Sequence, residues 1–157
     1  MQEVTNLIKK RITTIIISTL IAFGGLSLSN NWVSAANADG WRLSGTNWKY
    51  SLNGKDMTGW LLYNTKWYYF DASSNMAKGW IKYNNKMYYL NTGGDMQAGW
   101  LLQNGKWFYL NLDGSRADNS WILYNSKWYY MGSSGEMSVS TTTPDGYVIG
   151  ADGAWTG

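Results

Sequence analysis

The chain has 157 residues, which is enough for one ordinary domain or a short array of repeats. It contains no Cys and no His, so a disulfide framework, a thiolate or imidazole metal site and a His-based catalytic triad are excluded. Its 13 basic and 10 acidic residues give a net charge of +3, and its 11 Trp and 12 Tyr against 3 Phe favour half-buried aromatic surfaces that carry N–H and O–H groups.

The first 38 residues have the pattern of a secretory signal peptide. Lys9, Lys10 and Arg11 form a basic stretch, residues 12–28 are mostly apolar, and Ala36-Asn37-Ala38 fits a cleavage site of small residues. We therefore expect a signal-peptide helix here, with cleavage after Ala38 or, alternatively, after Ala35. An uncleaved membrane anchor is the other interpretation, although the apolar run is near the lower length limit for a span and contains Thr, Ser and Gly.

Removal of the signal peptide changes the charge balance. Residues 1–38 hold three basic residues and one acidic residue, so the mature part keeps 10 basic and 9 acidic residues, a net charge of +1. A mature chain this close to neutral gives no support to nucleic-acid binding, or to membrane binding after cleavage, through a basic patch.

Residues 39–157 are organised around a repeat. A Trp leads each unit, at positions 41, 60, 80, 100 and 121, so the spacings are 19, 20, 20 and 21 residues. The expected units are 39–59, 60–79, 80–99, 100–120 and 121–140, with a C-terminal cap over 141–157. The first unit diverges most and the last segment breaks the period, so both are expected to cap the array. A loose tail is the alternative for the last segment.

Each unit is predicted to be a β-hairpin, because two apolar runs flank two turn residues. The turns are Asn64-Thr65, Asn84-Asn85, Asn104-Gly105 and Asn125-Ser126. With Asn64-Thr65 as the turn, Tyr63 lies opposite Lys66 and Trp60 lies opposite Tyr69. Side chains alternate between the faces of a strand. One face therefore carries Trp60, Leu62, Trp67 and Tyr69, and the other, which we expect to be core, carries Leu61, Tyr63, Tyr68 and Phe70.

Both faces of such a hairpin are apolar, and an isolated hairpin is only marginally stable in water. Neighbouring hairpins must therefore cover one another. The predicted fold is all-β: a β-solenoid of stacked hairpins, preceded by the signal-peptide helix.

The motif Gly-Trp…Lys-Trp-Tyr-Tyr-Phe…Met-x-x-Gly-Trp resembles the choline-binding repeats, also called cell-wall-binding repeats, of Gram-positive surface proteins, autolysins and phage lysins. The resemblance covers nearly all of residues 39–157, and the end of the chain, from Pro144 to Trp155, looks like the end of clostridial arrays. It implies a left-handed superhelix that binds ligands in grooves between consecutive hairpins. The implied ligand is the choline headgroup of teichoic acids.

The resemblance also implies which residues form each site: the leading Trp and second Trp of one unit, and the last Tyr of the Trp-Tyr-Tyr run in the next. Carried over by position, the sites are Trp41, Trp48 and Tyr69; Trp60, Trp67 and Tyr89; Trp80 and Tyr109, with Met87 in place of the second Trp; and Trp100, Trp107 and Tyr130. Met87 is expected to weaken the third site, and Arg116 to disturb the fourth. Trp121 and Trp128 lack a clear partner, Tyr147 being the nearest candidate.

Two residue types allow more than one interpretation. The Met residues before the Gly-Trp steps could line the grooves or fill irregular gaps in the core. The Asp residues lie in Gly- and Ser-rich turns, where they commonly satisfy backbone N–H groups. A calcium loop needs a denser run of ligands, and a glycosidase needs two carboxylates beside a cleft. We therefore expect no metal, no cofactor and no catalytic residue.

The leading hypothesis is a secreted, non-catalytic module that is held non-covalently at the cell wall by choline-bearing teichoic acid or another wall polysaccharide. A carbohydrate-binding repeat module for glucan or another glycan, the targeting half of a cell-wall hydrolase, and a structural protein with an all-aromatic core are the alternatives. The signal pattern at the start and the closing motif at the end favour a complete chain over a hydrolase fragment. Homodimer formation is left open by the sequence.

Overall fold

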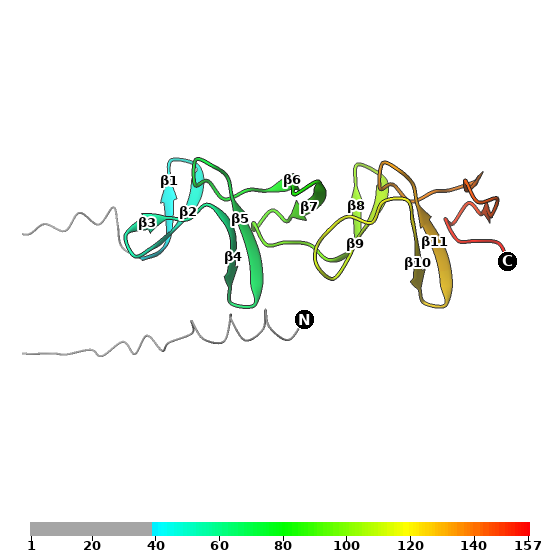
Figure 1. The fold of residues 1–157 in the computed structure, drawn as a ribbon, viewed down its shortest axis with the longest axis horizontal. Helices are drawn as coiled ribbons and strands as arrows, with labels where there is room; N and C mark the ends of the chain where they lie inside the picture. Colours follow the sequence, from blue (N-terminus) through cyan, green and yellow to red (C-terminus); the bar gives the residue numbers. More distant parts are fainter. Residues whose placement is uncertain (1–38) are drawn as a thin grey trace, which may run out of the picture. The chain divides into compact units, whose positions relative to one another are not determined.

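The computed structural model describes residues 39–157, which form short antiparallel hairpins that follow one another in a row (Figure 1). This confirms the all-β fold of stacked hairpins. The expected signal-peptide helix and both cleavage sites lie in residues 1–38, outside the described part. Within residues 39–157, no helix has the length and apolarity that a membrane span requires.

The strands pair in chain order. The first sheet contains β1 (Gly40–Ser44), β2 (Asn47–Leu52) and β3 (Lys55–Asp56), and the later hairpins are β4 (Gly59–Tyr63) with β5 (Lys66–Phe70), β6 (Gly79–Tyr83) with β7 (Lys86–Leu90), β8 (Gly99–Gln103) with β9 (Lys106–Leu110), and β10 (Ser120–Tyr124) with β11 (Lys127–Met131). A short closing pair follows, formed by β12 (Thr141–Thr142) and β13 (Val148–Ile149).

The predicted hairpin register is confirmed. Trp60 pairs with Tyr69 and Tyr63 pairs with Lys66. The turn residues Asn64 and Thr65 have φ values of 47° and 64°, and the three other predicted turns also place both central residues at positive φ. A two-residue turn of this kind matches the twist of the flanking strands, so the Asn-led turns fix which side chains face each other.

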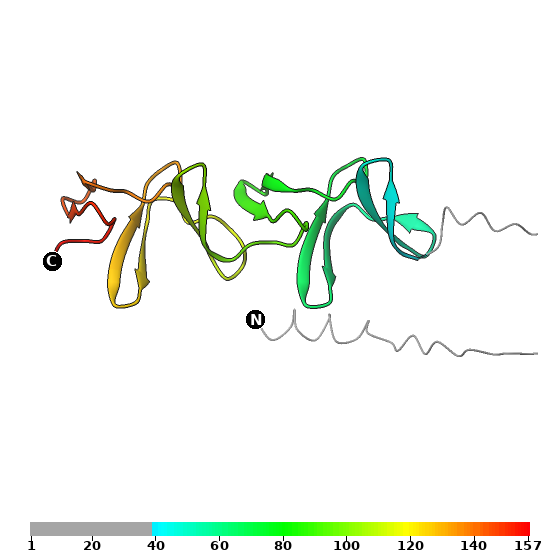
Figure 2. The same cartoon turned by 180° about the vertical axis from the view of Figure 1, so that it is seen from behind.

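Successive hairpins point in different directions around the row, as the front and back views show (Figures 1 and 2). They stack face to back: the Trp-bearing face of one hairpin packs on the opposite face of the next. The ring of Trp41 lies 4.9 Å from that of Tyr68 and 5.7 Å from that of Phe70. The backbone joins the same two units, because the N–H of Met76 donates to the carbonyl of Trp48 at 2.8 Å.

A column of buried side chains runs along the row, one from the end of the second strand of each unit. Phe70, Leu90, Leu110 and Met131 are fully buried, and Ile149 of the closing pair is 2% exposed. The first hairpin places Ser51 at this position, where its hydroxyl donates to Asp56 at 2.7 Å. Polar Ser51 thus ends the apolar column at one end of the row, and the closing pair ends it at the other.

Lysines at the start of the second strands reach across to acidic residues in the loops of later units. These ion pairs are Lys66–Asp95 at 3.4 Å, Lys86–Asp113 at 3.2 Å, Lys106–Glu136 at 2.7 Å and Lys127–Asp152 at 3.1 Å. In addition, Asp113 accepts hydrogen bonds from the hydroxyl and backbone N–H of Ser115. These bonds, together with Lys86, hold the pKa of Asp113 below its usual value.

These ion pairs between units predict that the folded protein loses stability in acid. Because the folded pKa of Asp113 is lowered, its stabilising contribution is complete above the unfolded value of about 3.9 and is lost as pH falls through the lower folded value. The pKa values of Asp95 and Asp152 are lowered as well. We expect the thermal unfolding midpoint, measured by circular dichroism, to decrease when the pH is lowered below about 4.

Asp113→Asn is the variant that assigns part of this effect. The variant should lose less than about 1 kcal/mol of unfolding free energy at pH 7, since Asp113 and Lys86 are both solvent-exposed. Its thermal midpoint should fall less than that of the unaltered protein between pH 7 and pH 3. A pH profile identical to that of the unaltered protein would contradict this assignment.

Candidate functional site

Aromatic grooves lie between successive hairpins, and the second groove shows their construction. Trp60 and Trp67 come from one hairpin, Tyr88 comes from the next, and Met96 follows from the loop after it. The rings of Trp60 and Trp67 are 6.4 Å apart at 88°, and those of Trp60 and Tyr88 are 5.1 Å apart at 67°. Ring planes set nearly at right angles form the walls of an open groove of about 220 Å³.

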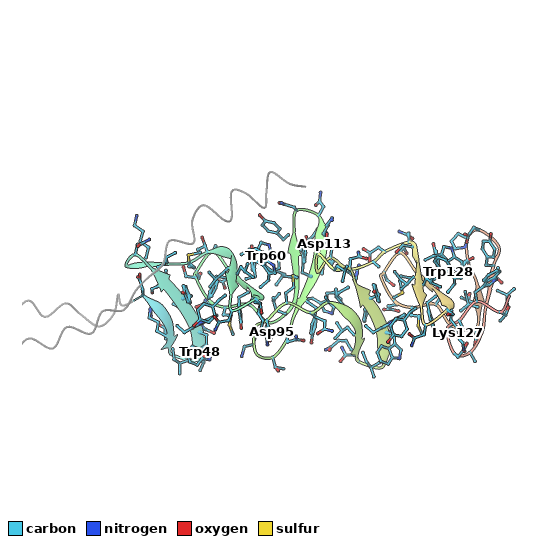
Figure 3. The ribbon with its side chains drawn as sticks, turned by 90° about the horizontal axis from the view of Figure 1, so that it is seen from below. Trp48, Trp60, Asp95, Asp113, Lys127 and Trp128 are labelled. Carbon is cyan, nitrogen blue, oxygen red and sulfur yellow. The ribbon has the colours of Figure 1, made fainter. Side chains whose placement is uncertain are left out.

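The same construction recurs along the row. The first groove is lined by Trp41, Trp48, Tyr68 and Met76; the fourth by Trp100, Trp107, Tyr124, Tyr129 and Met137; and the fifth by Trp121, Trp128, Tyr147 and Trp155. In Figure 3, Trp60 and Asp113 of the second groove lie on one side of the row.

The structure brings together the Trp pairs of the first, second and fourth grooves, but the third ring of each differs from the expectation. Tyr68, not Tyr69, contacts Trp41, and Tyr88, not Tyr89, contacts Trp60. Tyr109 and Tyr130 likewise contact the leading Trp of their own hairpins, Trp100 and Trp121, at 5.3 and 5.1 Å.

Face-to-back stacking explains this difference. Tyr69 shares a face with Trp60, its cross-strand partner, so it faces the following hairpin. Adjacent residues of a strand point to opposite faces, and Tyr68 therefore faces the preceding one. Tyr68, which we expected to be core, is half-buried and lines the first groove. The Tyr89 hydroxyl donates to Gln103 at 3.0 Å instead.

The methionines combine the two roles that the sequence left open. Met76 and Met96 line the first and second grooves, and each also packs against a glycine in the loop of the following unit. A Cβ on Gly94 would collide with Met76, and one on Gly114 would collide with Met96. Both glycines have positive φ, at 86° and 80°. Because these glycines have no side chain, they leave room for the thioethers at the base of both grooves.

The third groove departs from this pattern at every position except its leading Trp80. Met87 stands in place of the second Trp, and Phe108 takes the place of the hydroxyl-bearing ring, 5.1 Å from Trp80. Arg116 occupies the methionine position, since it bridges to Leu110 as Met96 bridges to Leu90.

The Arg116 guanidinium lies over Trp80, with its Cζ 5.5 Å from the ring centroid. Asp118 holds it there, accepting from Nε at 2.7 Å and from the second guanidinium nitrogen at 3.2 Å. The expectation that Arg116 disturbs the fourth groove is therefore wrong. The methionine position of each unit faces the groove behind it, so the arginine supplies the third groove with a cation of the protein's own.

The closing pair completes a fifth groove, in which Trp121 and Trp128 had no clear partner by sequence alone. Tyr147 precedes Val148 and Ile149 in the chain, which places it where Tyr68 stands in the second unit. Its ring lies 5.5 Å from that of Trp121 at 90°. Trp155 takes the methionine position, and its backbone N–H donates to the backbone carbonyl of Trp128 at 2.8 Å.

The aspartates satisfy backbone groups in their own turns, as the sequence predicted. Asp71 accepts from the N–H groups of Ser73 and Asn75, and Asp152 accepts from that of Ala154. Over residues 39–157, no cluster of three potential His, Cys, Asp or Glu ligands is present. The cross-unit lysine pairs were missed by sequence analysis, although a lysine before each second aromatic run was a visible signal.

Comparison with known proteins agrees with this geometry. Family models described as choline-binding repeats match residues 57–99, 77–121 and 115–155. No curated protein sequence matches the chain at a significant level.

Comparison with solved structures extends the similarity to the fold. Choline binding protein F from Streptococcus pneumoniae is 37% identical over 76% of this chain and 41% of its own, with a TM-score of 0.68. The modular autolysin LytC from the same organism is 30% identical over 75% of this chain and 28% of its own, with a TM-score of 0.64. The phage Cp-1 endolysin complexed with choline is 28% identical over 76% of this chain and 37% of its own, with a TM-score of 0.55.

This chain thus spans less than half the length of these solved relatives. The family matches together extend from residue 57 to residue 155, which is more than half of the chain. The chain therefore belongs to the choline-binding repeat family.

Proposed function

We propose that this protein binds choline headgroups of cell-wall teichoic acids in the grooves between its hairpins. The observation that carries the proposal is the lining of the second groove, in which Trp60, Trp67 and Tyr88 surround one open space with Met96 at its base. The structure of the related phage endolysin in complex with choline adds support.

The chemistry of the ligand fits this lining. A quaternary ammonium has no N–H to donate, and its charge is spread over methyl groups that pack on ring faces. Each well-placed ring contributes about 0.5–2 kcal/mol of cation–π attraction, and Trp is the strongest partner. The polarisable Met96 thioether adds a soft apolar contact.

Three grooves carry two Trp, a Tyr of the next hairpin and one Met, and the fourth groove adds a second Tyr, Tyr124. The proposed sites keep the tryptophans named from the sequence and take Tyr68, Tyr88 and Tyr129 as their third rings. The third groove is proposed to remain without choline, because Arg116 already places a cation on Trp80.

Each site is expected to be weak, with a dissociation constant on the order of millimolar, because the ligand is small and the grooves are open. A wall polymer carries many cholines, and several sites on one stack can engage it together. Avidity of this kind raises the overall affinity by about 10²–10⁴ without any new contact. Retention at the wall therefore depends on the number of working grooves.

The proposed role is non-catalytic attachment. In residues 39–157, each of the aromatic grooves described above is lined by at most one carboxylate, whereas a glycosidase needs two beside its cleft. With residues 1–38 as a cleaved signal peptide, the mature protein would be secreted and held non-covalently at the cell surface.

Trp67→Ala tests the second groove. Trp67 is 39% exposed, so its removal should spare the fold, weaken choline binding at this groove about tenfold, and lower the free choline concentration that elutes the protein from a choline-bearing resin. Leu62→Ala is the matched control, since Leu62 pairs with Trp67 across the hairpin but does not line the groove. It should elute like the unaltered protein.

Failure of the unaltered protein to bind the resin, or retention on immobilised glucan that free choline does not reverse, would overturn the choline proposal. The non-catalytic role has its own test. Isolated cell walls incubated with the protein should keep the turbidity of a buffer control, and clearing above that control would contradict it.

The third groove offers a gain-of-function test. Arg116→Met combined with Met87→Trp restores the groove set except for Phe108, and should add one choline site to the stoichiometry measured by calorimetry. Met87→Trp alone leaves the guanidinium on Trp80 and should add none. An added site in the single variant would show that Arg116 does not block this groove.

A further inference from the structure

The fifth groove differs from the others in both its rings and its charge. Three Trp line it, because Trp155 replaces the methionine and lies 5.6 Å from Tyr147 at 88°. Its volume is about 340 Å³, similar to the 320 Å³ of the fourth groove and larger than the 220 Å³ of the second. The carboxylate of Asp145 forms part of its wall.

This carboxylate lacks the partner that neutralises its counterparts. Asp113 lines the second groove and is paired with Lys86 at 3.2 Å, and Asp152 lines the fourth and is paired with Lys127 at 3.1 Å. Among residues 39–157, no Lys or Arg lies within ion-pair distance of Asp145. The fifth groove therefore presents an uncompensated negative charge beside four ring faces.

Hydrogen bonds fix this carboxylate in place. Its Oδ1 accepts from the hydroxyl of Thr143 at 2.6 Å, and its Oδ2 accepts from Nε1 of Trp121 at 3.2 Å. Thr143 is itself buried, and its oxygen also accepts from the backbone N–H of Tyr147. The Thr143 bond, and then the Trp121 bond, lower the pKa of Asp145. Since a carboxylate has about four acceptor positions, Oδ2 keeps room for another donor.

We propose that the fifth groove is a site for ammonium ligands that retain an N–H, such as a protonated dimethylamino headgroup. An N–H buried in a groove loses its hydrogen bonds to water, and in the second and fourth grooves the lining carboxylate is already paired with a lysine. Those grooves therefore favour quaternary ammonium. Asp145 supplies the missing acceptor, and a charge-assisted N–H···O⁻ bond is about twice as strong as a neutral one. This inference rests on the proposed function and adds a second ligand class to it.

The test compares choline with N,N-dimethylethanolamine, which differ by one methyl group at nitrogen. Indole N–H signals of the purified full chain would be followed by NMR at pH 7 during titration with each amine. Trp121 and Trp128 report on the fifth groove, and Trp60 and Trp67 on the second. We expect the affinity ratio of dimethylethanolamine to choline to be about tenfold higher at the fifth groove.

Asp145→Asn removes the charge while keeping the side-chain size. It should weaken dimethylethanolamine at the fifth groove about tenfold and choline to a smaller extent. The second groove of the same variant is the internal control. Because Asp145 does not line that groove, the ratio of the two affinities reported by Trp60 and Trp67 should not change.

Equal ratios at the two grooves, or an Asp145→Asn variant that weakens both ligands to the same extent, would overturn this inference and leave choline binding intact. Failure of the proposed function gives a different result: choline then shifts neither Trp60 nor Trp67. That outcome overturns the inference as well, since it assumes working aromatic grooves.

Discussion

The structure is held together by the contact between the leading Trp of one hairpin and the aromatic residue in the middle of the next hairpin's second strand. A hairpin with two apolar faces is marginal alone, and each unit lies mainly against its neighbours. Trp60 shows the geometry, with Tyr83 at 6.1 Å and Tyr88 at 5.1 Å on the following hairpin. Each such aromatic pair contributes about 0.5–1.5 kcal/mol beyond its buried area. Stability is then close to a sum over neighbouring units.

The same stacking creates the grooves. The leading Trp is half-buried beneath the next hairpin, while the second Trp lies nearer the hairpin tip, where coverage ends. Trp67 and Trp107 are 39% and 42% exposed for this reason. A binding surface therefore arises wherever two units meet, and the side chains that hold the units together are also those that line it. Arg116 shows the alternative, in which the protein's own guanidinium lies on the ring.

The fold was largely predictable because its signals are local. Asn-led turns fixed the hairpin register, and two apolar faces required stacking. The partner across each groove was not predictable in the same way. Tyr68 and Tyr69 are chemically identical neighbours, and only the packing of one hairpin on the next decides which ring reaches Trp41. The reach of Arg116 into the third groove and the fifth groove at Tyr147 also depend on contacts between units.

The buried column that ends at Ser51 and at Ile149 has a consequence for how such chains change length during evolution. Internal units contribute interchangeable residues to the column, and each joins its neighbour through the same backbone bond between the methionine position and the second Trp position. Duplication or deletion of one internal unit of about 20 residues would preserve both ends of the row. Gene rearrangement could thus change the number of grooves, and with it the overall affinity for a polymer, while the fold stays the same.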